Sequence, residues 1–141
     1  MDVAGLTIAL IDLCGKLYDT IQAVRNAPED VRKLVEELAA LKNTLESVRS
    51  VVASDRQTSV LEKLNTEIAA CLKDLERLDS KICASSNGLR GAVKEWWARF
   101  KWPMKENETR EYVSKIEGLK SHLMIALQAH QMYLTHLLDA I

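Results

Sequence analysis

The sequence predicts an all-α helical bundle of four long amphipathic helices and one short helix. Apolar residues recur at alternating steps of three and four along most of the chain, a spacing that places them on one face of a helix. The 141 residues include only 5 Gly and 2 Pro, so long stretches run without helix breakers. Hydrophobic residues make up 48% of the chain, enough for a core. β-branched residues do not cluster with period two, which argues against a sheet.

The first predicted helix runs from about Val3 to Arg25. Ile8 and Ile11 lie off its main apolar stripe, so its first three turns are apolar nearly all round. Such a helix is either buried at the centre of a bundle or destined for another apolar medium. The stripe itself consists of Val3, Leu6, Leu10, Leu13, Leu17, Ile21 and Val24.

Two further long helices follow. Asn26-Ala27-Pro28 ends the first helix, and Pro28 suits the first turn of the next because a missing N–H costs little there. Glu29 and Asp30 carry charges that favour a helix N-terminus. The second helix fades near Ala53-Ser54-Asp55, and the third ends before the loop at Ala84-Ser85-Ser86-Asn87-Gly88. Their stripes are Val31, Leu34, Leu38, Leu41, Leu45, Val48 and Val52, and then Val60 or Leu61, Leu64, Ile68, Leu72, Leu75, Leu78 and Ile82.

The remaining chain predicts one short and one long helix. The short helix runs from Leu89 to about Phe100 and is broken by Trp102-Pro103. The long one starts near Glu106 and continues to the end, without a capping residue or Gly after Ile141. We therefore expect residues 1–141 to form a single bundle domain at the N-terminus of a longer protein. The stripe that should join the last helix to the shared core is Tyr112, Ile116, Leu119, Leu123, Leu127, His130, Leu134, Leu137 and Ile141.

Charge and cysteine content exclude several function classes. The net charge is −1 and the 28% charged residues are mixed in sign, which argues against a nucleic-acid partner. Cys14, Cys71 and Cys83 are odd in number and lack CxxC spacing, so we interpret them as small core residues in a reducing compartment. The apolar N-terminus lacks a preceding basic residue and is too short to span a membrane, which predicts a protein that starts in the cytoplasm.

No catalytic constellation is evident. The chain has no glycine-rich phosphate loop, no zinc-protease motif and no nucleophile elbow. His122, His130 and His136 share one helix, but their spacings of eight and six place them on different faces, whereas two metal ligands would be four apart. We expect His130 to be a buried core residue. The sequence thus predicts a protein that is not an enzyme, with no catalytic residues, cofactor or metal.

Two segments have features that the core of a helical bundle does not require. In the first helix, Gly5 and Ala9 are four apart, a pattern that permits close helix approach in a membrane. This helix is either a central core helix or one that leaves the bundle for lipid or a homo-oligomer. The candidate insertion and oligomerisation residues are Val3, Gly5, Leu6, Ile8, Ala9, Leu10, Ile11 and Leu13.

The second segment combines tryptophan with basic residues. Trp favours the membrane interface, and neighbouring Lys or Arg favours anionic lipid. The alternative is a lid of the bundle, with its Trp side chains packed inward and its Lys side chains solvated. The candidate membrane-surface residues are Lys94, Trp96, Trp97, Arg99, Phe100, Lys101, Trp102 and Lys105.

Three stretches resemble the HeLo-like N-terminal domains of fungal STAND (NOD-like) receptors and their cell-death partners. The first is the apolar opening helix that leads through Ala27-Pro28-Glu29-Asp30-Val31 into a leucine-rich second helix. The second is RFKWPMKENETREYVSKIEGLK, which contains Lys101-Trp102-Pro103, and the third is SHLMIALQAH in the last helix. The resemblance spans nearly the whole chain.

The resemblance implies a role in fungal innate immunity, heterokaryon incompatibility and programmed cell death. It implies a membrane-targeting, oligomerising domain that is cytoplasmic at rest and is switched by an upstream STAND sensor or an amyloid-type signalling partner. On activation the domain would relocate to the plasma membrane and bind anionic lipids, led by its apolar first helix. The alternative is a homotypic protein-interaction adaptor without membrane activity.

Two carboxylates qualify the insertion hypothesis. Asp2 and Asp12 interrupt the apolar first helix, and a charge in the middle of an inserted helix costs roughly 2.5–3.5 kcal/mol. A pore-lining Asp12, or insertion only as far as Ile11, would remove the conflict.

Overall fold

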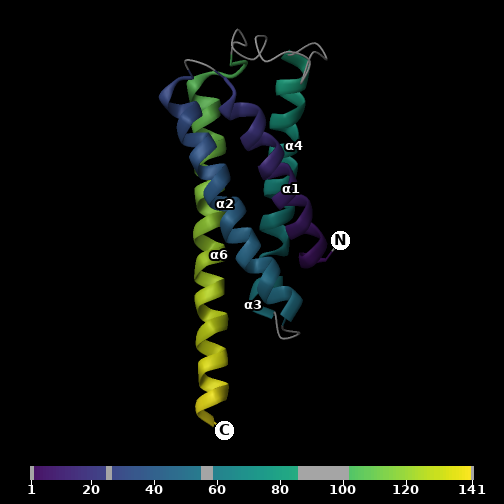
Figure 1. Cartoon of the computed structure of the whole chain (residues 1–141), viewed down its shortest axis with the longest axis vertical. Helices are drawn as coiled ribbons and strands as arrows, with labels where there is room; N and C mark the ends of the chain where they lie inside the picture. Colours follow the sequence, from purple (N-terminus) through teal and green to yellow (C-terminus); the bar gives the residue numbers. More distant parts are fainter. Residues whose placement is uncertain (1, 25–26, 55–58, 86–101, 141) are drawn as a thin grey trace.

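All regular elements in the described part of the chain, residues 2–24, 27–54, 59–85 and 102–140 of the computed structural model, are α-helices. The short helix predicted from Leu89 to Phe100 lies outside these residues. The prediction of an all-α fold with four long helices is confirmed. In chain order the helices are α1 (Val3–Gln22), α2 (Glu29–Ser54), α3 (Ser59–Glu62), α4 (Asn65–Ser85) and α6 (Glu106–Ala140) (Figure 1).

Local sequence sets where α1 and α2 begin. Asp2 caps α1, since its Oδ1 accepts a hydrogen bond from the Gly5 N–H at 2.9 Å. There the carboxylate also faces the positive end of the helix dipole. α2 begins after Pro28, whose carbonyl oxygen accepts the N–H groups of Val31 and Arg32 at 3.0 and 3.1 Å. Asp2 therefore starts the apolar first helix, and the expectation that it interrupts this helix is wrong.

The third predicted helix is divided into α3 and α4. The Leu64 N–H donates to the Leu61 carbonyl at 3.0 Å, a three-residue turn, and four-residue bonding resumes from the Ile68 N–H to the Leu64 carbonyl at 2.9 Å. Asn65 lies at this break. Asparagine disfavours helix interiors, because its side chain can form hydrogen bonds with nearby backbone groups, and it is better tolerated at a helix end. Leu61 and Ile68 are both buried, so the break leaves the apolar stripe in register.

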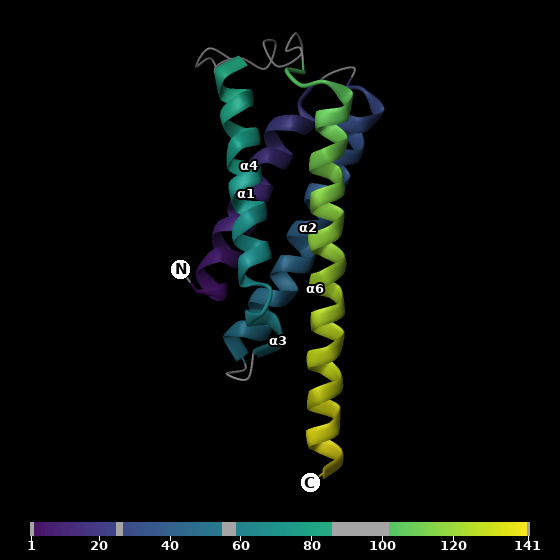
Figure 2. The same cartoon turned by 180° about the vertical axis from the view of Figure 1, so that it is seen from behind.

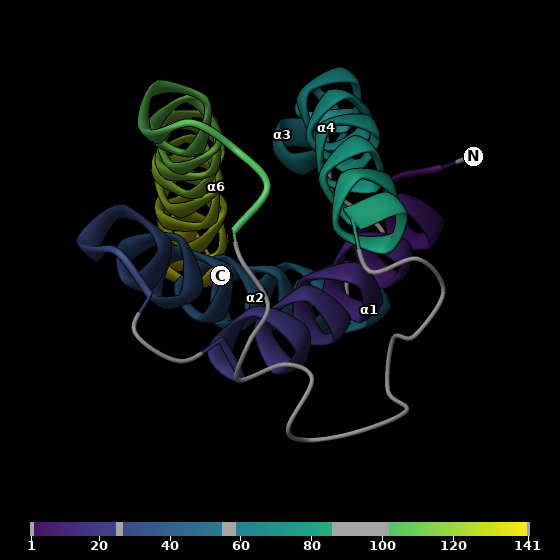
Figure 3. The same ribbon diagram turned by 90° about the horizontal axis from the view of Figure 1, so that it is seen from above.

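The four long helices enclose one core. α1 lies against α2 and α4, α2 also lies against α6, and α3 contacts α6. Seen from above, α4 and α6 stand on one side of the bundle and α1 and α2 on the other (Figure 3). The fully buried large side chains come from the predicted stripes, and are Leu10, Leu17, Ile21, Leu34, Leu38, Leu41, Leu45, Leu61, Ile68, Leu75, Leu78 and Ile82.

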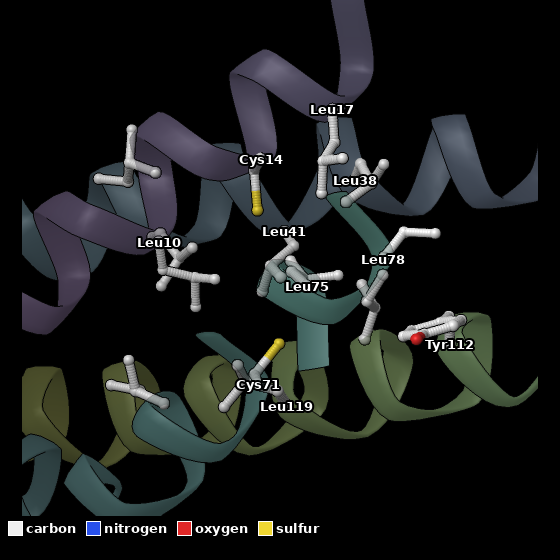
Figure 4. Close-up of a cluster of buried hydrophobic side chains, with 14 of the residues drawn as sticks. Leu10, Cys14, Leu17, Leu38, Leu41, Cys71, Leu75, Leu78, Tyr112 and Leu119 are labelled. Atoms are coloured by element: carbon white, nitrogen blue, oxygen red, sulfur yellow. The ribbon is translucent and has the colours of Figure 1, made fainter. Parts of the chain in front are cut away.

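Two cysteines belong to this core. Cys14 of α1 and Cys71 of α4 lie among the buried leucines (Figure 4), while Cys83 is half-buried, and all three are free thiols. Burial raises the pKa of Cys14 to about 12, and the nearby Cys71 adds to this increase. Burial likewise raises the pKa of Cys71 to about 12. Both thiols therefore remain protonated and act as small apolar residues, as predicted.

α6 is longer than the bundle that surrounds it. Its 35 residues span about 50 Å, and its lower part projects past α3 and the end of α2 (Figures 1 and 2). His130 is buried, as predicted, and is the last buried residue of α6. Leu134 and Leu137, which the periodicity assigned to the core, are exposed because no described helix of the bundle extends that far.

Candidate interaction surfaces

The predicted insertion residues of α1 lie mostly inside the bundle. Ile8 is the exception, with 42% of its surface exposed, while Gly5, Ala9 and Leu13 are half-buried. At rest, therefore, the apolar face of α1 is used for packing and is not available to lipid. The buried members of the set are Val3, Leu6, Leu10 and Ile11.

α1 is amphipathic in the structure, although its sequence looked apolar nearly all round. At about 100° per residue, Asp12, Lys16 and Asp19 fall within an arc of about 60° opposite the buried face, and all three are exposed. Thr7 is buried, but its hydroxyl donates to the Val3 carbonyl at 2.6 Å and is thus satisfied. Among the described helices, none has the length and apolarity required to cross a bilayer.

Ion pairs tie α6 to the bundle far more than they tie α1. Within the described residues, Lys16–Asp79 at 3.2 Å is the ion pair that joins α1 to another helix. The described packing of α1 against the other helices is thus mainly apolar, and such contacts are non-directional. By contrast, ion pairs join α6 to α2 at Arg110–Asp30, Lys33–Glu117 and Lys120–Glu37, and to α4 at Lys81–Glu108 and Lys115–Asp74. A hydrogen bond of 2.7 Å between His122 Nδ1 and Glu67 Oε2 also joins α6 to α4.

The second predicted set is described only at its end. Lys94, Trp96, Trp97, Arg99, Phe100 and Lys101 lie outside the described residues. Trp102 is half-buried against the core, and its indole N–H donates to Thr109 Oγ1 at 2.9 Å. Lys105 is exposed. Trp102 therefore packs inward, as expected if this segment is a lid of the bundle.

The exposed end of α6 forms a surface that the sequence analysis did not single out. We call residues 131–140 the α6 extension, and all of them are exposed. Tyr133, Leu134, Leu137 and Leu138 lie within an arc of about 140° centred on the line that faces the bundle higher up the helix. Their exposed fractions are 42%, 39%, 45% and 72%. The side of α6 that forms the core thus continues as an apolar strip without a described partner.

The opposite side of the α6 extension is mixed in character. Gln128, Thr135 and Asp139 lie there with Met132, which is 69% exposed. Residues 121–140 contain no Lys or Arg, and Asp139 is their one carboxylate. This scarcity of charge in a solvent-exposed helix was the sequence signal that could have revealed the surface.

Comparison with known protein families identifies the family of this chain. A family model described as pigment biosynthesis cluster protein PigL, N-terminal, matches residues 2–139. The chain belongs to the PigL N-terminal family. This family is related to the HeLo-like domains, which confirms that part of the predicted resemblance. No curated protein and no solved structure gives a significant match.

The extent of the PigL N-terminal match bears on both surfaces. Because the match runs from residue 2 to residue 139, it includes the whole of α1 and nearly all of the α6 extension. The projecting part of α6 is therefore a component of the PigL N-terminal domain and not a segment added beside it.

Proposed function

We propose that this domain is a protein-interaction module of a signalling protein, and that the apolar strip of the α6 extension is its contact surface. The observation that carries the proposal is the exposure of Tyr133, Leu134, Leu137 and Leu138 side by side on one helix face. Contiguous apolar patches on proteins in water mark sites of interaction. In a pigment biosynthesis cluster protein such a module would recruit or regulate a partner, a role that needs no catalysis.

The composition of the strip supports a protein partner over a lipid one. Helices that lie on membranes carry Lys or Arg beside their apolar face, whereas residues 121–140 carry none. Leucine and tyrosine are well suited to a helix-in-groove or helix-on-helix contact. The absence of Lys and Arg from residues 121–140 thus favours a protein partner over an anionic membrane surface.

Site-specific photocrosslinking in the native host tests this proposal. A benzoylphenylalanine at position 138, on the strip, should give discrete crosslinked products, to be identified by mass spectrometry. The same group at Lys73, an exposed position on α4, serves as the matched control. Leu134→Lys in the position-138 protein should abolish the products. If position 138 crosslinks no more than position 73, the α6 extension is not an interaction surface.

A second candidate function is membrane action by α1, as the HeLo-like resemblance implies. The supporting observation is that Lys16–Asp79 is the described ion pair that fastens α1 to the other helices. A released α1 would be an amphipathic helix with Asp12 on its polar side, which suits a position in the plane of the membrane interface. We propose that cell-death signalling, relocation to the plasma membrane and switching by an upstream STAND or amyloid-type partner belong to this mode.

The Ile8→Lys variant distinguishes an α1 that spans the membrane from an α1 that lies in the membrane interface. Ile8 is exposed and lies next to the polar arc, so the variant should fold. A lysine in a membrane-spanning α1 would block vesicle leakage, since it costs roughly 2.5–3.5 kcal/mol at the helix centre, whereas a lysine at the edge of an interfacial helix would not. We expect leakage of anionic vesicles to persist in this variant.

The thiol of Cys14 reports whether α1 leaves the bundle. In the resting protein Cys14 is buried and protonated, so a water-soluble maleimide should modify it slowly. Release of α1 onto anionic vesicles should speed this modification severalfold, compared with zwitterionic vesicles as the control. Unchanged protection of Cys14, together with absent leakage, would exclude the membrane mode.

A further inference from the structure

We infer that the partner of the α6 extension is a second copy of this chain, bound in the antiparallel direction. The inference rests on the proposed interaction function and names its partner. It starts from the position of the apolar strip, which lies on the bundle-facing side of α6 but beyond the end of α3 (Figure 2). The strip thus continues the core-facing side of α6 beyond the described helices that cover this side higher up.

Charge favours a second copy as the occupant. A two-fold axis places each residue of an interface near an identical residue of the other copy, so like charges oppose one another in symmetric contacts. Residues 121–140 have a single carboxylate, and Asp139 lies on the side opposite the strip. Two such helices can therefore meet without charge repulsion and without burying an unpaired charge.

Sterics select the antiparallel direction. Higher up α6, the side that carries Leu123 and Ala126 is covered by the chain's own helices. A parallel second helix laid on the strip would continue upward into the space of α2 and α3. An antiparallel helix laid on the strip avoids this clash, because it runs away from the first copy's α2 and α3 towards its own bundle.

The antiparallel arrangement covers the apolar strips of both copies at once. With the axis between residues 135 and 136, Leu134 of each copy lies beside Leu137 of the other, and Tyr133 beside Leu138. Residue 140 of each α6 then lies level with the end of the partner's bundle. The α6 extension is only about 15 Å long, so the contact is smaller than the roughly 1,200 Å² typical of stable complexes. The dimer is consequently weak and depends on concentration.

Sedimentation velocity of residues 1–141 over a wide concentration range tests the inference. The wild-type chain should shift from monomer to dimer as its concentration rises. Leu134→Lys with Leu138→Lys should remain monomeric at every concentration, with unchanged helicity and thermal midpoint, because both side chains are exposed. Met132→Lys, on the opposite side of the same helix, is the matched control and should dimerise like the wild type.

Spin labels at Ser121 test the direction, on a background in which the half-buried Cys83 is replaced by serine. The antiparallel arrangement separates the two labels by about 40 Å along the helix axis, whereas a parallel pair would bring them to the same level. A short distance, a wild-type monomer at all concentrations, or a dimer that survives the double lysine change would each overturn the inference. A monomeric chain whose position 138 still crosslinks to another protein would leave the proposed interaction function intact.

Discussion

The indole N–H of Trp102 donates to Thr109 Oγ1 at 2.9 Å, and this bond fastens the residues before α6 to the first turn of that helix. Thr109 is 1% exposed, and its hydroxyl in turn donates to the Lys105 carbonyl at 3.2 Å. The threonine hydroxyl thus serves as acceptor and donor at once, and Trp102, for which the sequence left a membrane surface or a bundle lid open, is held against the bundle.

Thr109→Val should therefore destabilise the fold by about 1 kcal/mol. The change keeps the shape of the side chain but leaves the indole N–H without its acceptor, and the half-exposed position of Trp102 allows water to compensate in part. Urea unfolding measures the difference. Thr109→Ser, which retains the hydroxyl, is the control, and equal destabilisation by both variants would contradict the assignment.

The ion pair between Lys120 and Glu37 should contribute more to stability than the pair between Lys33 and Glu117. Its atoms are 2.8 Å apart and its side chains are 24% and 15% exposed, compared with 3.5 Å and 57% and 42% for the second pair. Double-mutant cycles with alanine should give a coupling of about 1 kcal/mol for the first pair and near zero for the second. Equal coupling would show that burial does not distinguish them.

Leu10→Ala should destabilise the chain by roughly 2–5 kcal/mol, because Leu10 is fully buried between α1 and the other helices. Ile8→Ala removes a similar volume from the exposed side of the same helix and should cost less than about 1 kcal/mol. Thermal and urea unfolding provide the comparison. Similar losses from the two variants would mean that α1 does not rest in the bundle with this face inward.

The buried thiols should make stability depend on alkaline pH. The pKa of about 12 for Cys14 and Cys71 lies above the ordinary value of 9.0. The protonated thiols contribute fully to the free energy of unfolding below pH 9. This contribution is lost as pH rises from 9 towards 12, because the unfolded chain releases its thiol protons at a lower pH than the folded chain. Cys14→Ala with Cys71→Ala should therefore show a shallower decline in unfolding free energy from about pH 7.5 to about pH 10. An equal decline in the unfolding free energy of the variant and of the wild type would contradict this role of the two thiols.

Periodicity predicted which side of each helix is buried, but not where its partners end. The spacing of Leu134 and Leu137 continues that of Leu119 and Leu123, yet the first pair is exposed and the second is buried. The difference arises from the lengths of α2 and α3, which are properties of other segments. A stripe specifies a direction around one helix and carries no information about how far its neighbours extend.

The carboxylates of Asp2 and Asp12 have roles that hydropathy alone does not predict. By hydropathy Asp2 interrupts an apolar run, but its side chain accepts a hydrogen bond from the backbone N–H of Gly5, three residues later, and so caps the helix. Asp12 lies within the helix, on the exposed side that it shares with Lys16 and Asp19, and this arrangement shows that α1 is amphipathic. The break at Asn65 was missed for a related reason, since Leu61 and Ile68 keep their register across it.

The uninterrupted length of α6 gives the domain a mechanical property. An α-helix of 35 residues behaves as a stiff rod, so a twist or pull applied at Leu138 reaches the buried half of the helix. There α6 has less contact with α4 than with α2, and the ion pairs at the α4–α6 boundary include Lys115–Asp74 at 3.6 Å. We expect a load on the projecting end to open the α4–α6 boundary before the α2–α6 boundary, and so to expose the Cys71 thiol to water.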